Sequence, residues 1–117
     1  MTPIEIAIKA ALLLDDKKAQ NIKVIKVEEI SSLCDYFVVA SGTSSTQVQA
    51  LADNVEEKLK TEGVAPYAVE GYRSNGWILL DYGTVLVHVF TTVARDYYDL
   101  DHLWSDGVEI EIDYKTE

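Results

Sequence analysis

Apolar residues recur along the chain with two periods, which divide it into helices and strands. A helix is expected to start at Thr2-Pro3-Ile4-Glu5, where a capping residue precedes a proline and a glutamate stands three residues after the cap. A second amphipathic helix follows Ser44 and ends near Gly63. The apolar face of the first helix comprises Ile4, Ile8, Ala11 and Leu12. That of the second comprises Val48, Leu51, Ala52, Val55 and Leu59.

Strands are predicted where β-branched residues gather or apolar and polar residues alternate. Residues 22–28 largely alternate, whereas residues 36–40 are continuously apolar, which is typical of a strand buried on both faces. Residues 67–70 could form a short strand, and residues 77–81 and 85–90 flank a turn and predict a hairpin. One or two short helices are then suggested by Val93, Tyr97, Leu100, Leu103 and Trp104.

This order of elements predicts an α/β fold, with a mixed sheet of about five strands flanked by helices. The chain has 117 residues, of which 48% are hydrophobic and 26% charged, so residues 1–117 are expected to form a single compact domain. No apolar run approaches the ~18 residues of a membrane span. The first residues lack the basic segment of a secretion signal, so the cytoplasm is the expected compartment.

The charge of the chain is strongly negative and unevenly placed. Ten Lys and Arg against twenty Asp and Glu give a formal net charge of −10. Residues 99–117 contain seven acidic residues and one lysine, so they carry −6 of this total. A negative surface disfavours binding to nucleic acid. It is compatible either with simple solubility or with a basic protein partner.

Residue types that support catalysis are present but poorly arranged. The Gly42–Ser45 turn before the second helix suits an anion, but Thr43, Ser44 and Ser45 are also helix caps, and Ser44 with Gln47 can form a capping box. Neither a dinucleotide fingerprint nor a P-loop is present. We therefore expect no catalytic residue, no metal site and no cofactor.

The remaining candidates for metal or nucleophilic chemistry lack partners in the sequence. Cys34 is the only cysteine, which excludes an intramolecular disulfide, and a buried structural thiol is the expected role. His88 and His102 are fourteen residues apart and belong to no further ligand pattern. The carboxylates that could hold Mg²⁺ stand far downstream of the turn, apart from Asp81: they are Asp99, Asp101, Glu109, Glu111 and Asp113.

The hairpin carries the most informative surface. If Tyr82 and Gly83 form a two-residue loop, Trp77 pairs with His88 across the two strands. One face then combines Trp77, Leu79, Asp81, Thr84, Leu86 and His88, and the other is aliphatic. A tryptophan beside a charge is typical of a binding hot spot, but helices on both faces of the sheet would make Trp77 a core residue. Residue types alone leave both interpretations open.

The chain also resembles the Iojap or ribosomal silencing factor (RsfS) family over about residues 3–106. The segments that carry the resemblance occur in the family's order: they are Cys34–Ser45, Val69–Gly71, Trp77–Gly83, Val87–Phe90, Arg95–Leu100 and Leu103–Trp104. The resemblance implies a fold related to a minimal nucleotidyltransferase. It also implies a protein that is not an enzyme and that binds the large ribosomal subunit through ribosomal protein L-fourteen. Such proteins block joining of the small subunit and repress translation when nutrients are scarce, as in stationary phase.

The resemblance places the partner-binding surface around the tryptophan-containing hairpin. Trp77 and Leu79 would supply the apolar centre, Glu70 and Asp81 would pair with basic side chains, and Tyr82 would add a contact at the rim. His88 belongs to the same face of the hairpin. The sequence leaves the oligomeric state open, and this apolar face could also pair two copies of the chain as a homodimer away from the ribosome.

Two alternatives to silencing remain open at this point. A large-subunit assembly factor would use the same surface, and a nucleotide-binding transferase would use the Gly42–Ser45 turn. Residues 107–117 form an acidic extension beyond the point where shorter family members end. Its alternating Val108, Ile110 and Ile112 could be an added strand or a mobile tail.

Overall fold

The computed structural model describes residues 1–27, 34–71, 76–99 and 106–114. Three helices occur in these segments: α1 (Pro3–Asp16), α2 (Ser45–Thr61) and α3 (Thr92–Tyr98). The predicted capping box begins α1, because Thr2 Oγ1 accepts the Glu5 N–H at 3.3 Å and Glu5 Oε1 accepts the Thr2 N–H at 2.8 Å. Among the described residues, no helix is long and apolar enough to span a bilayer.

Six strands form one mixed sheet in the described part of the chain, in the order β3-β4-β5-β2-β1-β6. Their bounds are β1 (Gln20–Lys26), β2 (Tyr36–Gly42), β3 (Ala68–Glu70), β4 (Trp77–Asp81), β5 (Val85–Thr91) and β6 (Val108–Ile110). β2 and β5 are parallel, and the other neighbouring strands pair antiparallel. The predicted α/β class is confirmed, and the strand beyond the expected five is β6.

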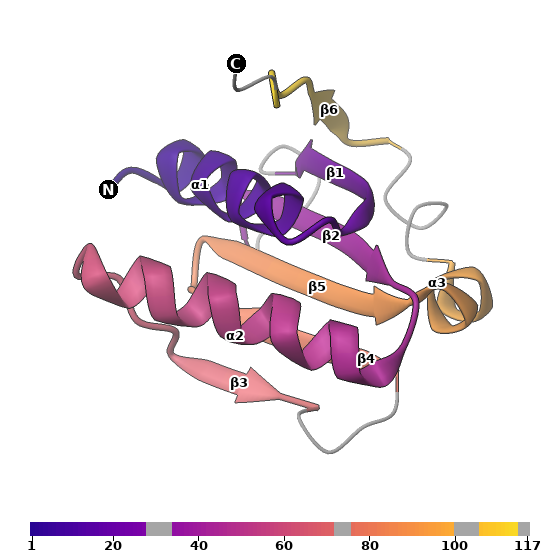
Figure 1. Ribbon diagram of the computed structural model, residues 1–117. Helices are drawn as coiled ribbons and strands as arrows, with labels where there is room; N and C mark the ends of the chain where they lie inside the picture. The colour runs from indigo at the N-terminus through magenta and orange to yellow at the C-terminus, as the bar shows by residue number, and fades with distance from the viewer. Residues whose placement is uncertain (28–33, 72–75, 100–105, 115–117) are drawn as a thin grey trace.

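The main core lies between the sheet and the two longer helices, which cover the same face of the sheet (Figure 1). The predicted apolar stripe of α2 is buried throughout. The predicted stripe of α1 is wrong in part, because Leu12 is 37% exposed and Ile4 and Ile8 are only partly buried. Instead, α1 buries Ile6, Ala7, Ala10, Ala11 and Leu14. Small alanine side chains on this face let the helix approach the sheet closely.

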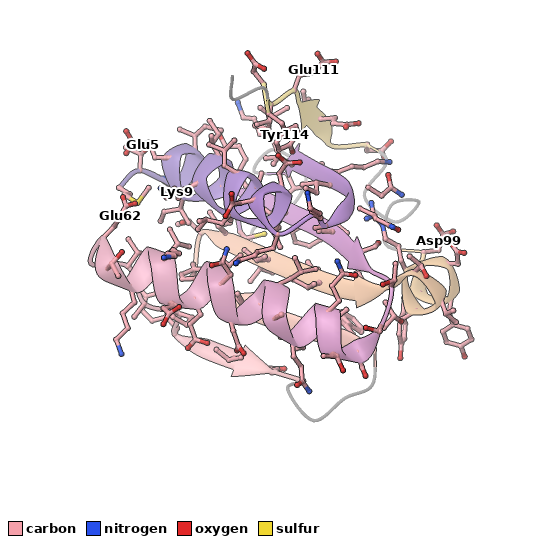
Figure 2. All side chains as sticks on the ribbon, in the orientation of Figure 1. Glu5, Lys9, Glu62, Asp99, Glu111 and Tyr114 are labelled. Atoms are coloured by element: carbon pink, nitrogen blue, oxygen red, sulfur yellow. The ribbon has the colours of Figure 1, made fainter. Side chains whose placement is uncertain are left out.

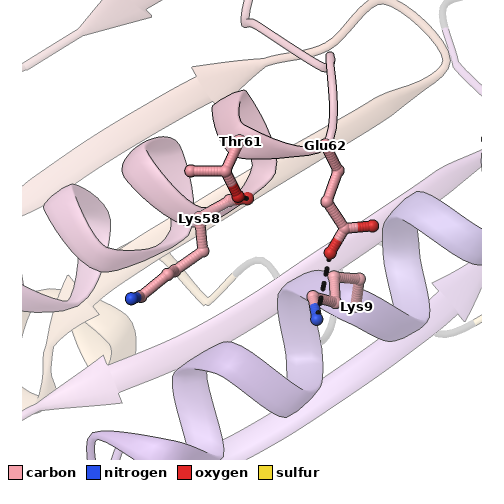
Figure 3. A network of polar contacts seen from close by, with 4 residues as sticks. All are labelled: Lys9, Lys58, Thr61 and Glu62. Atoms are coloured by element: carbon pink, nitrogen blue, oxygen red, sulfur yellow. Dashed lines mark hydrogen bonds and ion pairs between the residues drawn. The ribbon is translucent and has the colours of Figure 1, made fainter.

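An ion pair also joins the middle of α1 to the C-terminal end of α2. Figure 3 shows Lys9 of α1 directed at Glu62, the residue that caps the C-terminus of α2, with Nζ 3.1 Å from Oε2. Both side chains are well exposed, so water and salt screen this pair and it adds little to the free energy of unfolding.

A smaller apolar cluster lies on the opposite face of the sheet, as the alternation of side chains along the strands requires. It consists of Ile25, Val27, Cys34, Phe37, Val39 and Phe90. Cys34 is the buried thiol that the sequence predicts. Burial, assisted by the charges of Asp35 and Asp81, raises the pKa of this thiol to about 11, so it is protonated at neutral pH.

The beginning of the acidic extension is an added strand rather than a mobile tail. β6 pairs antiparallel with β1, with Val24 opposite Ile110 and Lys26 opposite Val108. Beyond the strand, Ile112 and Tyr114 pack against the main core, and Figure 2 shows Tyr114 beside α1. The described part of the extension therefore belongs to the fold.

Candidate functional site

The predicted hairpin forms, but with a different register. Tyr82 N–H donates to Val85 O at 2.9 Å, so the two-residue loop is Gly83-Thr84 rather than Tyr82-Gly83. In the strand pairing, Trp77 consequently stands opposite Phe90 instead of His88, and Leu79 stands opposite His88. The shift is two residues, and because the side-chain period of a strand is also two, the set of residues on each face is preserved.

A hollow of about 320 Å³ lies at the β3–β4 edge of this face. Glu70, Gly71, Trp77, Leu79 and Tyr98 line it. Three of these residues, Glu70, Trp77 and Leu79, were selected from the sequence. They meet because β3 pairs with β4 so that Glu70 stands opposite Leu79.

Gly71 makes the close packing of this hollow possible. Its φ of +87° is in the left-handed region that favours glycine. A Cβ at this position would lie 2.2 Å from the backbone oxygen of Trp77, so no other residue fits without displacing β4. The Gly71 backbone can therefore form one wall of the hollow directly beside the tryptophan.

Trp77 is half-buried and stands among other aromatic rings. Its ring centroid is 5.0 Å from that of Phe90 and 4.8 Å from that of Tyr98. Its indole Nε1 donates a hydrogen bond to His88 Nδ1 at 3.1 Å. The indole is therefore supported from beneath and at one edge, and it also lines the hollow. This arrangement combines features of both interpretations left open by the sequence.

His88 is not a surface residue, contrary to its expected place in the partner-binding set. It is 5% exposed, and its ring lies 4.8 Å from that of Phe37. Burial lowers the pKa of His88 to about 4, so the imidazole is neutral at physiological pH. It is linked to the hollow through its hydrogen bond to Trp77, which lines the hollow.

Tyr82 also differs from expectation. It follows Asp81 on the strand and therefore points to the opposite face, where it is 5% exposed in the core beneath α2. Burial, with the charge of Glu56 on α2, raises the pKa of its phenol. The rim contact predicted for Tyr82 is thus unavailable, because a one-residue step along a strand reverses the side chain.

Asp81 lies at the far end of β4 from the hollow. Its Oδ1 accepts the Gly83 N–H at 2.8 Å and closes the hairpin turn. Asp81 is only partly buried, so its negative charge can also attract a basic partner from solution. Asp81 therefore has a structural task in addition to the electrostatic one that the sequence suggests.

Besides Gly71, two residues that shape the site were not selected from the sequence, namely Tyr98 and Arg95. Tyr98 enters the hollow from α3, which lies at the end of the sheet (Figure 1). Arg95 is 4% exposed and holds α3 there, because Nη1 donates to Asn21 O on β1 and to Ser41 Oγ on β2, the latter at 3.0 Å. Both residues lie within the resembling segment Arg95–Leu100, which offered the only signal for them.

The Gly42–Ser45 turn acts as a helix cap. Ser44 Oγ accepts the Gln47 N–H at 3.1 Å. The Gln47 side chain does not complete the expected box with Ser44, since its Oε1 accepts the N–H and the hydroxyl of Thr43 at 2.6 and 2.9 Å. The hydroxyls of Thr43 and Ser44 are thus engaged in hydrogen bonds at the start of α2.

Metal ligands do not gather in the part of the chain that the structure describes. There, no three His, Cys, Asp or Glu side chains approach closely enough to hold an ion. Glu109 and Glu111 lie on and just beyond β6, at the opposite edge of the sheet from β3 and β4. Asp101 and His102, also considered from the sequence, are outside the described residues.

Comparison with known proteins gives consistent results. The family model described as "Ribosomal silencing factor during starvation" matches residues 1–117. The chain is 38% identical over 105 residues to "Ribosomal silencing factor RsfS" of Bacillus subtilis, covering 90% of this chain and 89% of that protein. It is 27% identical over 111 residues to the chloroplastic protein Iojap of Arabidopsis thaliana, of which it spans 46%. A crystal structure of a protein from Chromobacterium violaceum, 41% identical, matches with a TM-score of 0.86 over 90% of this chain and 88% of that one.

Proposed function

The chain belongs to the ribosomal silencing factor (RsfS) family, and we propose on this premise that it represses translation by occupying the large ribosomal subunit. A protein bound at the face where the small subunit docks would prevent the large and small subunits from joining. The family description and the names of its relatives denote a regulator rather than an enzyme. Blocking of this kind needs only affinity and bulk. The protein would act in the cytoplasm, where bacterial ribosomes work, when nutrients are limited.

The proposed partner on the large subunit is ribosomal protein L-fourteen. The observation that carries this assignment is the hollow of Glu70, Trp77, Leu79 and Tyr98 on a chain with a net charge of −10. Half-buried aromatic rings around an apolar centre, with a carboxylate at the edge, suit an apolar or arginine side chain projecting from a basic protein. Neighbouring ribosomal RNA would repel the acidic surface and so limit binding elsewhere on the ribosome.

The set of contact residues follows from their exposure. Trp77, Leu79 and Tyr98 would supply apolar contact, and Glu70 and Asp81 would face basic side chains. The same aromatic surface favours pairing of two copies of the chain away from the ribosome, in competition with the ribosomal partner. Sedimentation of the isolated protein at increasing concentration measures this pairing.

The decisive experiment mixes the purified protein with isolated large subunits and sediments the mixture through sucrose. A parallel tube also receives small subunits. We expect the protein to travel with large but not with small subunits, and joined particles to decrease. Absence from the large-subunit fraction would refute the proposal.

Each alternative has its own outcome. Co-sedimentation with normal joining would favour an assembly factor, and loss of the protein would then leave immature large subunits. Saturable binding of ATP or CTP with Mg²⁺ would revive the nucleotide-binding transferase. The capped Gly42–Ser45 turn leads us to expect no such binding.

A further inference from the structure

Directly behind the proposed docking surface, which is the hollow lined by Glu70, Trp77, Leu79 and Tyr98, stands a buried polar atom with no partner in the described part of the chain. His88 Nε2 is buried and makes no hydrogen bond to any residue that the structure describes. The other ring nitrogen, Nδ1, accepts the Trp77 indole N–H at 3.1 Å. Because Nδ1 acts as the acceptor in a neutral imidazole, the ring proton is on Nε2. A donor is therefore left unsatisfied in an apolar environment, which costs folding free energy.

Packing alone gives no reason for a histidine at this position. The surrounding rings are those of Phe37, Trp77 and Phe90, all of which an apolar aromatic side chain would also contact. A phenylalanine would keep these contacts and remove the unsatisfied donor. The feature that a phenylalanine lacks is an acceptor for the indole N–H.

The value of that acceptor lies in its direction. Ring contacts with Phe90 and Tyr98 hold Trp77 in place but distinguish poorly between the two edges of the indole. A hydrogen bond from Nε1 requires one edge to point at His88 and so selects a single ring orientation. In that orientation the remaining surface of the ring lines the hollow.

We propose that His88 is a positioning residue for docking: by accepting the indole N–H, it holds the Trp77 ring in the orientation that meets the partner. This inference rests on the proposed function, because it treats the hollow as the docking surface. His88 itself does not touch the partner. Its benefit is pre-organisation, since a ring already held in its bound orientation loses less conformational freedom on binding.

Two substitutions separate this role from simple packing. His88→Phe removes the acceptor but keeps an aromatic ring and abolishes the unsatisfied donor. His88→Asn removes the ring but places an amide oxygen near the position of Nδ1, where it can still accept from Trp77. We expect His88→Phe to unfold at a temperature equal to or above that of the wild type, yet to bind large subunits about tenfold more weakly. We expect His88→Asn to be less stable but to bind within about threefold of the wild type.

A second readout follows the indole without any ribosome. Trp77 and Trp104 give two indole N–H signals in a nitrogen-edited NMR spectrum, and Trp77→Phe assigns them. We expect hydrogen exchange of the Trp77 indole to accelerate at least about tenfold in His88→Phe and to remain near the wild-type rate in His88→Asn.

A double-mutant cycle completes the test. In a Trp77→Phe background there is no indole N–H to position, so adding His88→Phe should cause no further loss of binding. An equal loss in both backgrounds, or unchanged binding with accelerated indole exchange, would overturn the inference. Failure of the wild type to bind would refute the proposed function, and the indole exchange rates would still decide whether His88 holds Trp77.

Discussion

Trp77 shows how one residue can belong to both the core and the surface. Its ring packs on the fully buried Phe90, and it also lines the hollow. Trp77→Ala should therefore weaken binding to large subunits by more than about 1 kcal/mol, as expected for a tryptophan at a hot spot. The measurement is a binding isotherm for a variant whose circular dichroism confirms folding.

A matched control for Trp77 is Val108→Ala. Val108 is 60% exposed on β6, at the opposite edge of the sheet from β3 and β4. The Val108→Ala substitution also removes exposed apolar surface, but it does not alter the hollow. Equal effects of the two substitutions would mean that the loss of binding is not specific to the hollow.

Asp81 combines a structural and an electrostatic role, and these can be separated. Asp81→Asn keeps an oxygen that can accept the Gly83 N–H but removes the charge. We expect it to slow association with large subunits at low ionic strength, and the difference to vanish as salt screens the charge. Stopped-flow association rates at several salt concentrations provide the measurement, and a difference that persists at high salt would contradict an electrostatic role.

His88 also predicts a pH dependence of stability. Burial lowers its pKa from about 6.5 in the unfolded chain to about 4 in the folded protein, so between these values the unfolded chain binds more protons. The contribution of the neutral histidine is complete above pH 6.5 and is lost as pH falls towards 4, for a total of roughly 3 kcal/mol. The measurement is the difference in unfolding free energy between wild type and His88→Phe from pH 7 to 4. A constant difference would show that His88 titrates normally.

At the scale of elements, β6 depends on the tight packing of the glycine that precedes it. A Cβ at Gly107 would lie 2.5 Å from Ile25 Cγ2 and 3.0 Å from the backbone oxygen of Lys26. Gly107→Ala should therefore push β6 away from β1 and lower the free energy of unfolding by about 1–3 kcal/mol. Urea unfolding measures the change. The neighbouring Asp106→Ala, at an exposed position, should leave stability within about 0.5 kcal/mol.

The helices illustrate when an apolar pattern identifies a buried face. In α2 the apolar residues recur at helical spacing along one face and polar residues fill the other, so its buried stripe was predicted correctly. α1 has apolar residues almost all round, including Ile4, Ile8 and Leu12 on the less buried side. A helix of this kind is oriented by the shape of the surface it meets, which only the packed structure supplies.

At the scale of the whole molecule, the net charge of −10 opposes RNA and attracts basic protein. We expect affinity for isolated ribosomal protein L-fourteen to fall more steeply with salt than affinity for the intact large subunit. In the intact subunit, salt also screens the repulsion from RNA, and the two effects partly cancel. Titrations at about 50 and 200 mM salt test this, and a steeper slope for the intact subunit would contradict it.

The sequence by itself determined the α/β class and the order of the elements from α1 to β5, and it left β6 open. Helix caps, alternating apolar residues and β-branched runs are local signals, because each is contained within a few residues. The capping box of Thr2 with Glu5 and the apolar stripe of α2 are two examples. It also indicated three of the residues in the hollow, Glu70, Trp77 and Leu79, because two lie on one strand face and the family resemblance pointed to the third.

Only the tertiary structure decided how distant segments meet. The burial of His88, the arrival of Tyr98 from α3 and the pairing of β6 with β1 depend on contacts between residues far apart in the chain. The structure also decided the hairpin register, and with it that Tyr82 belongs to the strand pairing rather than to the loop. Local patterns leave such contacts degenerate, because a register shift of two residues preserves the faces but changes every partner. Packing of the whole molecule removes that degeneracy, and with it selects the residues that line the hollow.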